Sequence, residues 1–346
     1  MLRILSGKSQ TLRSAFRPLQ IFKTVPQATM ATGKADNKDM KIDSLFDVSH
    51  ITAVVTGGGT GIGLMITQAL QSNGAKVYIT GRRKEVLDQT AQRYSTGPGS
   101  IHVLPGDVST KDGAVKLAKE IEGKEPTGIQ LLVNNAGVAR DKDTMFPAVG
   151  QPDFSDAVSI SQHFLKTKDE QWAETMKVNV AGAYYMSMAL LPLLVKGRDA
   201  TPGYTSQVVN VSSISGAMKG PSMGQPIYAT SKAAETHLGR ILATLFKDVK
   251  VRVNTIAPGL FPSEMTAGSS GDDNKSVLNT RPSNPAGRTG HDTDMGATIL
   301  FLAGRGGLFY NGQILYPDGG MFEIMMPRNF AYSAPGSTLI QPAINN

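Results

Sequence analysis

From residue 51 onward, short runs of β-branched and aliphatic residues alternate with longer segments in which apolar residues recur at helical spacing. This alternation predicts strands and helices that take turns around a parallel sheet. Seven strands are expected: "ITAVVT" (51–56), "AKVYIT" (75–80), "SIHVLPG" (100–106), "IQLLVNN" (129–135), "SQVVNVSS" (206–213), "VRVNTIAPG" (251–259) and "GQILYPDGG" (312–320). The pattern predicts one doubly wound α/β sheet, in which ligands bind outside the carboxyl ends of the strands.

Several stretches lie outside this alternation. They are a leader (1–45), a polar insert with Gly and Pro (138–168) and a tail (322–346). The body between leader and tail, residues 46–321, contains no internal repeat and no linker that would divide it, so a single domain is expected. Residues 264–290, which are polar and rich in Gly, Ser and Pro, are predicted to form a lid over the substrate.

Composition and charge exclude several classes of function. The 346 residues include no cysteine, which excludes disulfides, thiolate metal sites and a cysteine nucleophile, and no metal site is expected. The formal charge is +7, but the first 35 residues carry six positive charges and no acid: Arg3, Lys8, Arg13, Arg17, Lys23 and Lys34. The rest of the chain is near neutral, which argues against a nucleic-acid surface on the fold.

The leader is basic, rich in Ser and Thr, and has apolar residues spaced to share a helical face. These properties are typical of a mitochondrial transit peptide. Two alternatives stay open: a disordered tail, or a translation start at Met30 that would leave the protein in the cytoplasm. The richest later apolar run, "YYMSMALLPLLV", is short and broken by Pro192, so no membrane span is expected.

A glycine-rich turn, "TGGGTGIG" (56–63), joins the first strand to a helical pattern. Its spaced glycines let the backbone turn tightly against a pyrophosphate, whose charge is favoured by the free N–H groups and the positive dipole end of the helix. This context predicts a dinucleotide site, whereas the alternative is a purely structural turn. The loop residues expected to contact the cofactor are Gly57, Thr60, Gly61, Ile62 and Gly63.

The ends of the next strands indicate which dinucleotide is bound. Arg82 and Arg83 stand where many NAD sites carry an acid, and two cations there favour the extra phosphate of NADP; the alternative is a pair of solvated arginines. The third strand ends in "GDVS" and the fourth in "NNAG" (134–137), whose small residues let a cofactor lie close. Further cofactor contacts are expected from Asp107, beside the adenine, and from Val108, Asn135 and Ala136.

In "IYATSK", Tyr228 and Lys232 are four residues apart in a predicted helix, so their side chains share a face. A nearby ammonium favours the phenolate form of a tyrosine, which makes proton exchange near neutral pH easier. The pair is interpreted as proton-transfer machinery. On these two residues alone, the alternative is an ordinary aromatic residue and lysine on one side of a helix.

Taken in order, "TGGGTGIG", "NNAG", "NVSSISG", "YATSK", "NTIAPG" and "DGG" resemble the short-chain dehydrogenase/reductase family over roughly residues 48–321. The resemblance implies a single Rossmann-type domain, commonly a homodimer or homotetramer. It also implies reversible hydride transfer between a nicotinamide and a carbonyl or alcohol. The alternative is a catalytically silent NADP-binding regulatory or scaffolding protein, against which the intact serine, tyrosine and lysine argue.

Carried over by position, the resemblance assigns a role to each of four residues. Tyr228 would exchange a proton with the substrate oxygen, and Lys232 would favour its phenolate and bind the nicotinamide ribose. Ser213, followed by "ISG", would hydrogen-bond the carbonyl oxygen. Asn179, in "KVNVAG", would hold a water of the proton relay, although an asparagine there is often only a helix bend or cap.

The sequence also departs from the family pattern. Ser213 and Tyr228 are fifteen residues apart, slightly more than usual, and the insert is longer than usual and would lie beside the substrate pocket. Pro258 and Gly259 are expected to contact the cofactor, as is Ser263, which replaces the usual threonine near the nicotinamide carboxamide. The runs "PGLFPSEMT", "GRTG" and "FLAG" most resemble the rhamnolipid-type 3-oxoacyl reductase subgroup, which implies a 3-oxoacyl thioester or a bulky ketone as the small-molecule substrate.

Overall fold

The computed structural model describes residues 35–280 and 282–324 of the chain. By its contacts the chain divides into residues 1–34 and residues 35–346, and the described structure belongs to the second unit. The basic segment on which the mitochondrial prediction depends therefore lies outside the described residues. So does most of the predicted tail.

Seven parallel strands form one sheet in the order β3-β2-β1-β4-β5-β6-β7. They are β1 Thr52–Thr56, β2 Lys76–Thr80, β3 Ser100–Val103, β4 Leu131–Asn134, β5 Gln207–Val211, β6 Arg252–Ile256 and β7 Ile314–Leu315. Every residue of β5 and β6 is buried. Strands of a parallel sheet that are covered on both faces have nearly unbroken runs of β-branched and aliphatic residues in their sequence, because neither face meets water. The predicted doubly wound α/β fold is confirmed, and each observed strand lies inside a predicted range.

The structure shortens the last predicted strand to two residues. After β7 the chain reaches Pro317, which has no backbone N–H for a ladder hydrogen bond. It then turns through Gly319 and Gly320, whose φ angles of 66° and 83° favour glycine. The turn carries the chain across the carboxyl edge of the sheet, where Gly259 N donates to Pro317 O.

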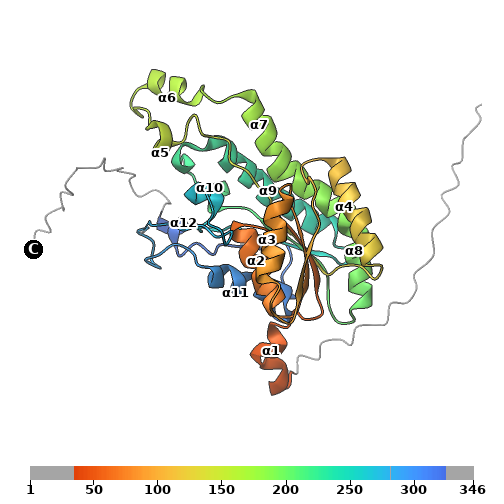
Figure 1. Ribbon diagram of the computed structural model, residues 1–346. Helices are drawn as coiled ribbons and strands as arrows, with labels where there is room; N and C mark the ends of the chain where they lie inside the picture. The colour runs from red at the N-terminus through yellow and green to blue at the C-terminus, as the bar shows by residue number, and fades with distance from the viewer. Residues whose placement is uncertain (1–34, 281, 325–346) are drawn as a thin grey trace, which may run out of the picture. The chain divides into compact units, whose positions relative to one another are not determined.

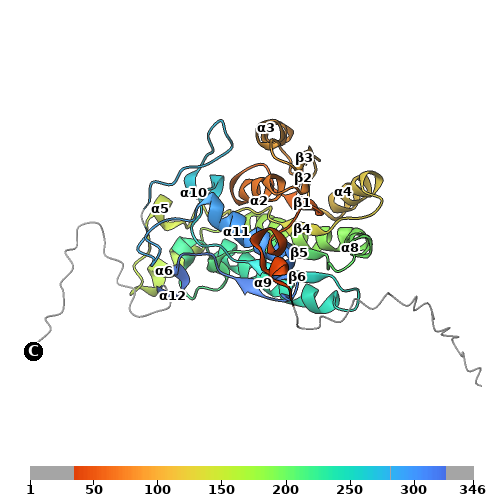
Figure 2. The same cartoon turned by 90° about the horizontal axis from the view of Figure 1, so that it is seen from below.

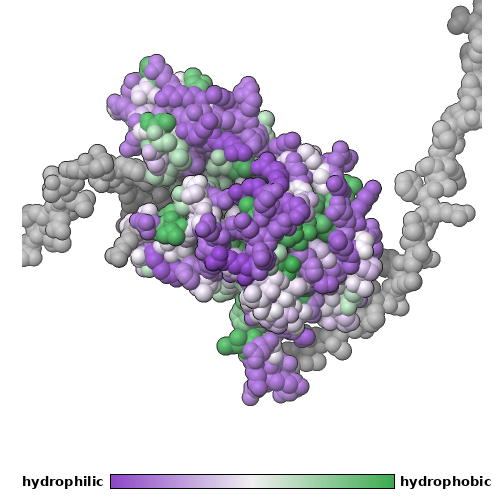
Figure 3. Space-filling model, in the orientation of Figure 1, coloured by the Kyte–Doolittle hydropathy of each residue, from purple (hydrophilic) through white to green (hydrophobic). Residues whose placement is uncertain are grey.

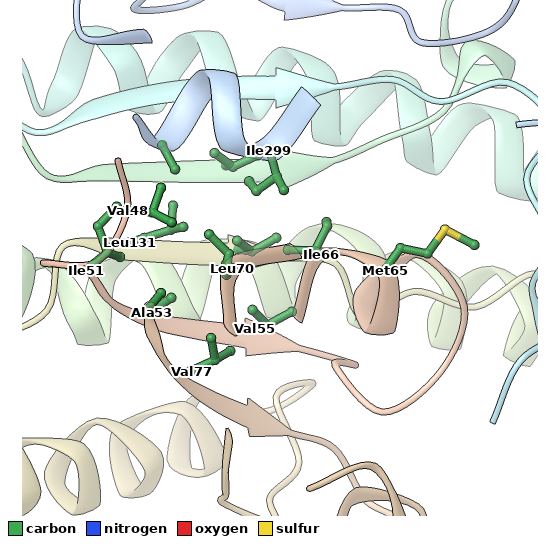
Figure 4. Packing of buried hydrophobic residues seen from close by; sticks show 14 of the residues in the cluster. Val48, Ile51, Ala53, Val55, Met65, Ile66, Leu70, Val77, Leu131 and Ile299 are labelled. Atoms are coloured by element: carbon green, nitrogen blue, oxygen red, sulfur yellow. The ribbon is translucent and has the colours of Figure 1, made fainter. Parts of the chain in front are cut away.

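Helices cover both faces of the sheet (Figures 1 and 2). One face is covered by α2 Gly61–Ser72, α3 Lys84–Tyr94 and α11 Asp292–Ala303. The other is covered by α4 Lys111–Lys124, α8 Ala183–Ala200 and α9 Pro226–Leu245. Figure 4 shows Ile66 and Leu70 of α2 among side chains from the strands, with Ile299 of α11 beside them. The core is thus two apolar layers separated by the sheet, each removing aliphatic side chains from water.

A continuous helical stretch, Asp169–Ala200, is long and apolar enough to cross a membrane by length and composition alone. It consists of α7 Asp169–Met176, the π-helical segment η2 Lys177–Gly182 and α8. Its apolar window is 44% buried within the protein, and Met186, Leu190 and Leu194 pack in the core against the sheet. Packing in a globular core accounts for these apolar residues.

The predicted insert contains α5 Phe146–Val149 and α6 Ala157–Phe164, which lie beyond the carboxyl edge of the sheet (Figure 1). Thr144 Oγ1 donates to Gly224 O at 2.8 Å, so the insert is joined to the loop that precedes α9. The side of the insert in view is largely hydrophilic (Figure 3).

Short elements complete the described chain. They are the helices α1 Ile42–Leu45, α10 Glu264–Ala267 and α12 Met321–Ile324, and the 3-10 turns η1 Asn37–Met40, η3 Ile214–Gly216, η4 Ser222–Gly224 and η5 Arg305–Gly307. Two of them, η1 and α1, fall within the predicted leader. The domain boundaries and the lid remain predictions.

Candidate active site

The phosphate loop lies between β1 and the N-terminus of α2, as the glycine pattern predicts. A methyl group added at Gly63 would lie 2.1 Å from Gly57 O and 2.5 Å from Asn135 Nδ2, so the loop backbone closes directly on the helix start. Thr60 is the N-cap of α2, yet its side chain makes no capping hydrogen bond. The first N–H groups of α2 are therefore available to an anion such as a pyrophosphate.

Asn135, which directly follows β4, holds the phosphate loop in place by hydrogen bonds. Its Nδ2 donates to Thr56 O at 2.9 Å and to Gly57 O at 3.2 Å. The N–H groups of Asn135 and Ala136 both donate to Thr56 Oγ1, at 2.9 and 3.0 Å. The "NNAG" segment thus shapes the cofactor loop through its own hydrogen bonds, whereas the sequence predicts only a direct contact with the cofactor.

Arg82 and Arg83 are exposed where β2 turns into α3. Arg83 forms a two-point ion pair with Glu264 of α10, with Nη2 at 2.7 Å from Oε2 and Nη1 at 3.2 Å from Oε1. Next to Glu264, Ser263 lies against the phosphate loop, since a methyl group on Gly61 would be 2.9 Å from Ser263 Cβ. Ser263, the residue just before the predicted lid, therefore packs against the phosphate loop.

Asp107 follows β3 and accepts a hydrogen bond from Ser109 N at 2.9 Å. Burial raises the pKa of Asp107, but the Ser109 hydrogen bonds and the positive charge of Arg82 outweigh it, so the pKa lies below its ordinary value. Arg82 and Asp107, both predicted to contact the cofactor, thus lie near enough for their charges to interact. Val108, the next residue, is buried in the core layer beneath α4 and α8.

Tyr228 and Lys232 lie on one face of α9, with Lys232 Nζ 5.9 Å from the centre of the tyrosine ring. Lys232 is only 3% exposed, and its ammonium donates to Val211 O at 2.8 Å and to Glu235 Oε2 at 2.7 Å. Burial lowers the pKa of Lys232, but the Glu235 carboxylate and the Tyr228 phenol outweigh it and hold the pKa above its ordinary value. The lysine is therefore a charged group inside the protein.

Asn179 lies in η2, a π-helical segment of a kind often found at functional sites. Its amide is fully buried and bonded on both sides: Oδ1 accepts from Val138 N at 2.8 Å, and Nδ2 donates to Val138 O and to Ser231 Oγ, each at 2.9 Å. Ser231 Oγ in turn donates to Tyr228 O. The Asn179 side chain thus connects the segment after "NNAG" to the helix that carries the tyrosine.

The structure separates three neighbouring serines. Ser212 is buried and donates to Lys232 O at 2.8 Å, and Ser215 Oγ accepts from Ser222 Oγ. Ser213 is half-buried, and its Oγ accepts from Ser215 N at 3.1 Å. Among the described residues, no acceptor is recorded for its hydroxyl proton. The hydroxyl proton of Ser212 is therefore used within the protein, whereas those of Ser213 and Ser215 remain available to a substrate oxygen.

Asp141, at the start of the insert, caps the helix that carries the tyrosine. Its Oδ1 accepts from Ile227 N at 2.8 Å and its Oδ2 from Tyr228 N at 3.1 Å, although the side chain is 2% exposed. Burial raises the pKa of Asp141 in spite of these backbone hydrogen bonds. Sequence reasoning missed this residue, because its partners are 86 and 87 positions away.

The remaining predicted contacts lie after β6. Pro258 O accepts from Ile214 N at 3.0 Å, which holds this segment beside the loop that follows Ser213. Ser263 is the N-cap of α10 and shares a capping box with Thr266. Gly259 packs on Asp318, so that a methyl group there would lie 2.7 Å from Asp318 Cα.

The predicted residues thus gather at the carboxyl edge of the sheet. A methyl group on Gly137 would lie 3.4 Å from both Lys232 Nζ and Asn179 Oδ1, which places "NNAG" beside the proton-transfer pair. Within residues 35–280 and 282–324, no group of three or more His, Asp or Glu side chains could hold a metal ion. The cradle of loop N–H groups fits the pyrophosphate of a dinucleotide, and Arg82 is exposed near it, whereas Arg83 is paired with Glu264.

Known proteins resemble this chain over most of its length. A family model described as enoyl-(acyl carrier protein) reductase matches residues 57–322. Short-chain dehydrogenase/reductase PhomF′ of Diaporthe leptostromiformis is 41% identical over 288 residues, which cover 81% of this chain and 94% of that protein. The rhamnolipids biosynthesis 3-oxoacyl-(acyl-carrier-protein) reductase of Pseudomonas aeruginosa is 34% identical over 278 residues, or 80% of this chain and 97% of that protein.

A solved structure, the Pseudomonas aeruginosa RhlG/NADP active-site complex, superimposes with a TM-score of 0.65 at 32% identity. The match covers 80% of this chain and 98% of that one. The similarity therefore extends over most of this chain and nearly all of that one.

Proposed function

The chain belongs to the short-chain dehydrogenase/reductase family of oxidoreductases, and we propose that it is an NADPH-dependent reductase that interconverts a carbonyl group and a secondary alcohol. One observation carries the proposal. Tyr228 and the buried ammonium of Lys232 share a face of α9, beside the glycine-rich turns that follow β1 and β4.

The residues divide the chemistry between them. When bound, the nicotinamide supplies or accepts the hydride. The Tyr228 hydroxyl donates its proton to the carbonyl oxygen during reduction, and takes a proton back during oxidation. The Ser213 hydroxyl hydrogen-bonds the same oxygen and stabilises the charge that develops there. The Lys232 ammonium favours the phenolate that remains on Tyr228 and has a donor for the nicotinamide ribose.

NADP is proposed over NAD because Arg82 and Arg83 follow β2 and no acid stands between Thr80 and Lys84. The similar Pseudomonas aeruginosa structure is described as a complex with NADP, which supports this choice. The loop N–H groups at the start of α2 would hold the pyrophosphate.

A 3-oxoacyl thioester is proposed as substrate, with a bulky ketone as the broader class. Two 3-oxoacyl-(acyl-carrier-protein) reductases, of Pseudomonas aeruginosa and Chlamydia muridarum, are 34% and 30% identical to this chain. A hollow of about 300 Å³ at the insert is lined in part by Lys142 and Lys168, and also by Arg140, which is ion-paired with Glu174 of the same lining. The two lysines suit an acyl group carried on a phosphorylated arm, and Asp141, which precedes Lys142 in the chain, caps the tyrosine helix.

The proposal is tested with purified protein, NADPH and a panel of 3-oxoacyl thioesters and other ketones. Wild-type protein should oxidise NADPH with at least one of them, and Tyr228→Phe should abolish turnover while it still binds NADPH. Tyr310→Phe, which changes an exposed tyrosine that follows η5, is the matched control and should keep full activity. NADPH binding without turnover on any carbonyl would instead identify a silent binding module.

Two further proposals concern location and assembly. Mitochondrial targeting is proposed from the basic leader, and import into isolated mitochondria with loss of the N-terminus tests it; a stable full-length cytosolic protein would refute it.

A homodimer or homotetramer is proposed from the family and from the exposed apolar side chains of Tyr184, Ile241 and Leu245 on α8 and α9. Light scattering during gel filtration would measure the assembly, and a monomer at micromolar concentration would refute it.

A further inference from the structure

Helix α9 carries a buried ion pair between Lys232 and Glu235, which follow Tyr228 on the same helix. Lys232 Nζ and Glu235 Oε2 are 2.7 Å apart, and the two side chains are 4% and 1% exposed. A fully buried carboxylate is rare unless it is paired, because removing its charge from water is costly. Leaving one member of such a pair alone is costlier still. Glu235 is therefore matched specifically to the ammonium of Lys232.

The hydrogen bonds of the ammonium show what the pairing does. An ammonium has three N–H donors. Two of those of Lys232 are used, one by Val211 O at 2.8 Å and one by Glu235 Oε2 at 2.7 Å. The described residues offer no acceptor for the third, which is therefore available to a ligand; the Lys232 ammonium lies 3.4 Å from the position of a methyl group on Gly137. The two bonds hold the long lysine side chain in one orientation, facing the glycine-rich end of β4.

Charged groups on neighbouring elements do not replace Glu235 in this pair. The helix packs against β5, β6, η2, η3 and α7. Their charged residues are Arg252 on β6, Lys177 in η2, and Asp169, Glu170 and Glu174 on α7. Among the described residues, Lys232 is the ion-pair partner of Glu235, and the Tyr228 phenol is the other titratable group that acts on the lysine.

We propose that Glu235 is a positioning residue, which orients the ammonium of Lys232 and keeps it protonated while Tyr228 exchanges its proton. The proposal rests on the proposed carbonyl reductase function. Burial raises the pKa of Glu235 to about 7 against the opposing charge of Lys232. The carboxylate is therefore ionised above about pH 7, the range in which a lysine without a counter-ion would start to lose its proton in a buried site.

The test compares the pH dependence of ketone reduction in wild-type protein and Glu235→Gln. Glutamine keeps the size and a hydrogen-bonding oxygen but removes the charge. The variant should match wild type near pH 6, and its alkaline limb of kcat/KM should move down by about one pH unit or more, because the unpaired ammonium loses its proton earlier. Glu235→Asp, which restores the charge on a shorter side chain, should return the limb toward the wild-type pH.

A second buried glutamate, paired with the partly exposed Lys76, provides the matched control. Glu125 is 7% exposed and accepts from Lys76 Nζ at 3.0 Å and from Tyr78 Oη at 2.6 Å, away from the site. Glu125→Gln should cost stability without moving the alkaline limb. If Glu235→Gln and Glu125→Gln both leave the limb at the wild-type pH, Glu235 has only a structural role and the proposal is wrong.

A direct measurement separates this proposal from the proposed function. In protein labelled with ¹⁵N-lysine, the Lys232 side-chain signal is assigned by its loss in Lys232→Arg and titrated without substrate. Glu235→Gln should lower the titration midpoint of that signal, and an unchanged midpoint refutes the proposal even if ketones are reduced. A lowered midpoint in a protein that reduces no ketone would instead leave the pair established and the proposed function refuted.

Discussion

Arg83 and Glu264 are 181 positions apart in the sequence, yet their side chains form a two-point ion pair, with Nη2 and Oε2 at 2.7 Å. The pair joins the turn after β2 to α10, at the start of the predicted lid. A guanidinium presents the same pair of donors to a carboxylate and to a phosphate. In this structure the carboxylate of Glu264 therefore takes the donors that a 2′-phosphate would need.

We expect Glu264→Gln to tighten NADPH binding about two- to five-fold and to leave NADH binding nearly unchanged, because it frees Arg83 from an exposed and hence weak ion pair. Replacing Arg82 and Arg83 by alanine should weaken NADPH far more than NADH. Dissociation constants measured by fluorescence at fixed salt test both statements. Glu122→Gln, which breaks the exposed pair with Lys196, is the control. Equal weakening of both cofactors in the arginine variant would refute the NADP assignment.

Asp141→Ala should lower kcat for ketone reduction at least ten-fold, because Ile227 N and Tyr228 N lose their acceptor and the tyrosine loses its fixed position. It should also cost about 1–3 kcal/mol of unfolding free energy, as for buried donors left without partners. Denaturant unfolding and steady-state kinetics measure the two effects. Asp156→Ala, which removes the exposed N-cap of α6, should cost about 1 kcal/mol and leave kcat unchanged. Similar kcat values in both variants would contradict the positioning role of Asp141.

Gly63→Ala should abolish cofactor binding, since the added methyl group would overlap Gly57 O at 2.1 Å and force the phosphate loop open. The same substitution at Gly123 of α4 meets no atom within 4 Å. It should stabilise the protein by roughly 0.5–1 kcal/mol, because alanine loses less conformational freedom in a helix than glycine. Isothermal titration with NADPH and thermal unfolding of both variants check the pair of outcomes; unimpaired binding by Gly63→Ala would show that the loop is not the cofactor site.

Folding stability should depend on pH through Glu235. Its pKa rises from 4.5 to about 7 on folding, so the folded state holds a proton that the unfolded state has already released. This contribution is fully present below pH 4.5 and is lost as the pH rises to about 7. The melting temperature of wild type relative to Glu235→Gln should therefore fall across that window, as scanning calorimetry would show. A constant difference between the two proteins would mean that the carboxyl group does not titrate there.

Much of this protein can be predicted from local sequence. Strands buried on both faces have runs of β-branched residues in their sequence, so the positions of all seven strands can be predicted. The turn from Gly57 to Gly63 and the spacing of Tyr228 and Lys232 are also local, because a strand-turn-helix unit and one helical turn bring nearby residues together. The sequence could not show how strongly Ser212, Ser213 and Ser215 differ, since the difference lies in their hydrogen-bond partners.

Glu235 is only three residues from Lys232, yet this spacing does not predict a buried ion pair. Lysine and glutamate at that spacing usually form a solvated surface pair of little consequence. Only packing of α9 against the sheet turns it into a buried pair with an altered pKa.

By itself the sequence determined the parallel sheet, the phosphate loop and the tyrosine-lysine face, because each depends on residues within a few turns of chain. The tertiary structure decided which groups surround them: Asp141 at the start of α9, Asn135 behind the loop, and Glu264 on Arg83. These contacts join loops that leave different strands at one edge of the sheet. Their formation depends on the order of the strands and on burial, which only the folded chain establishes.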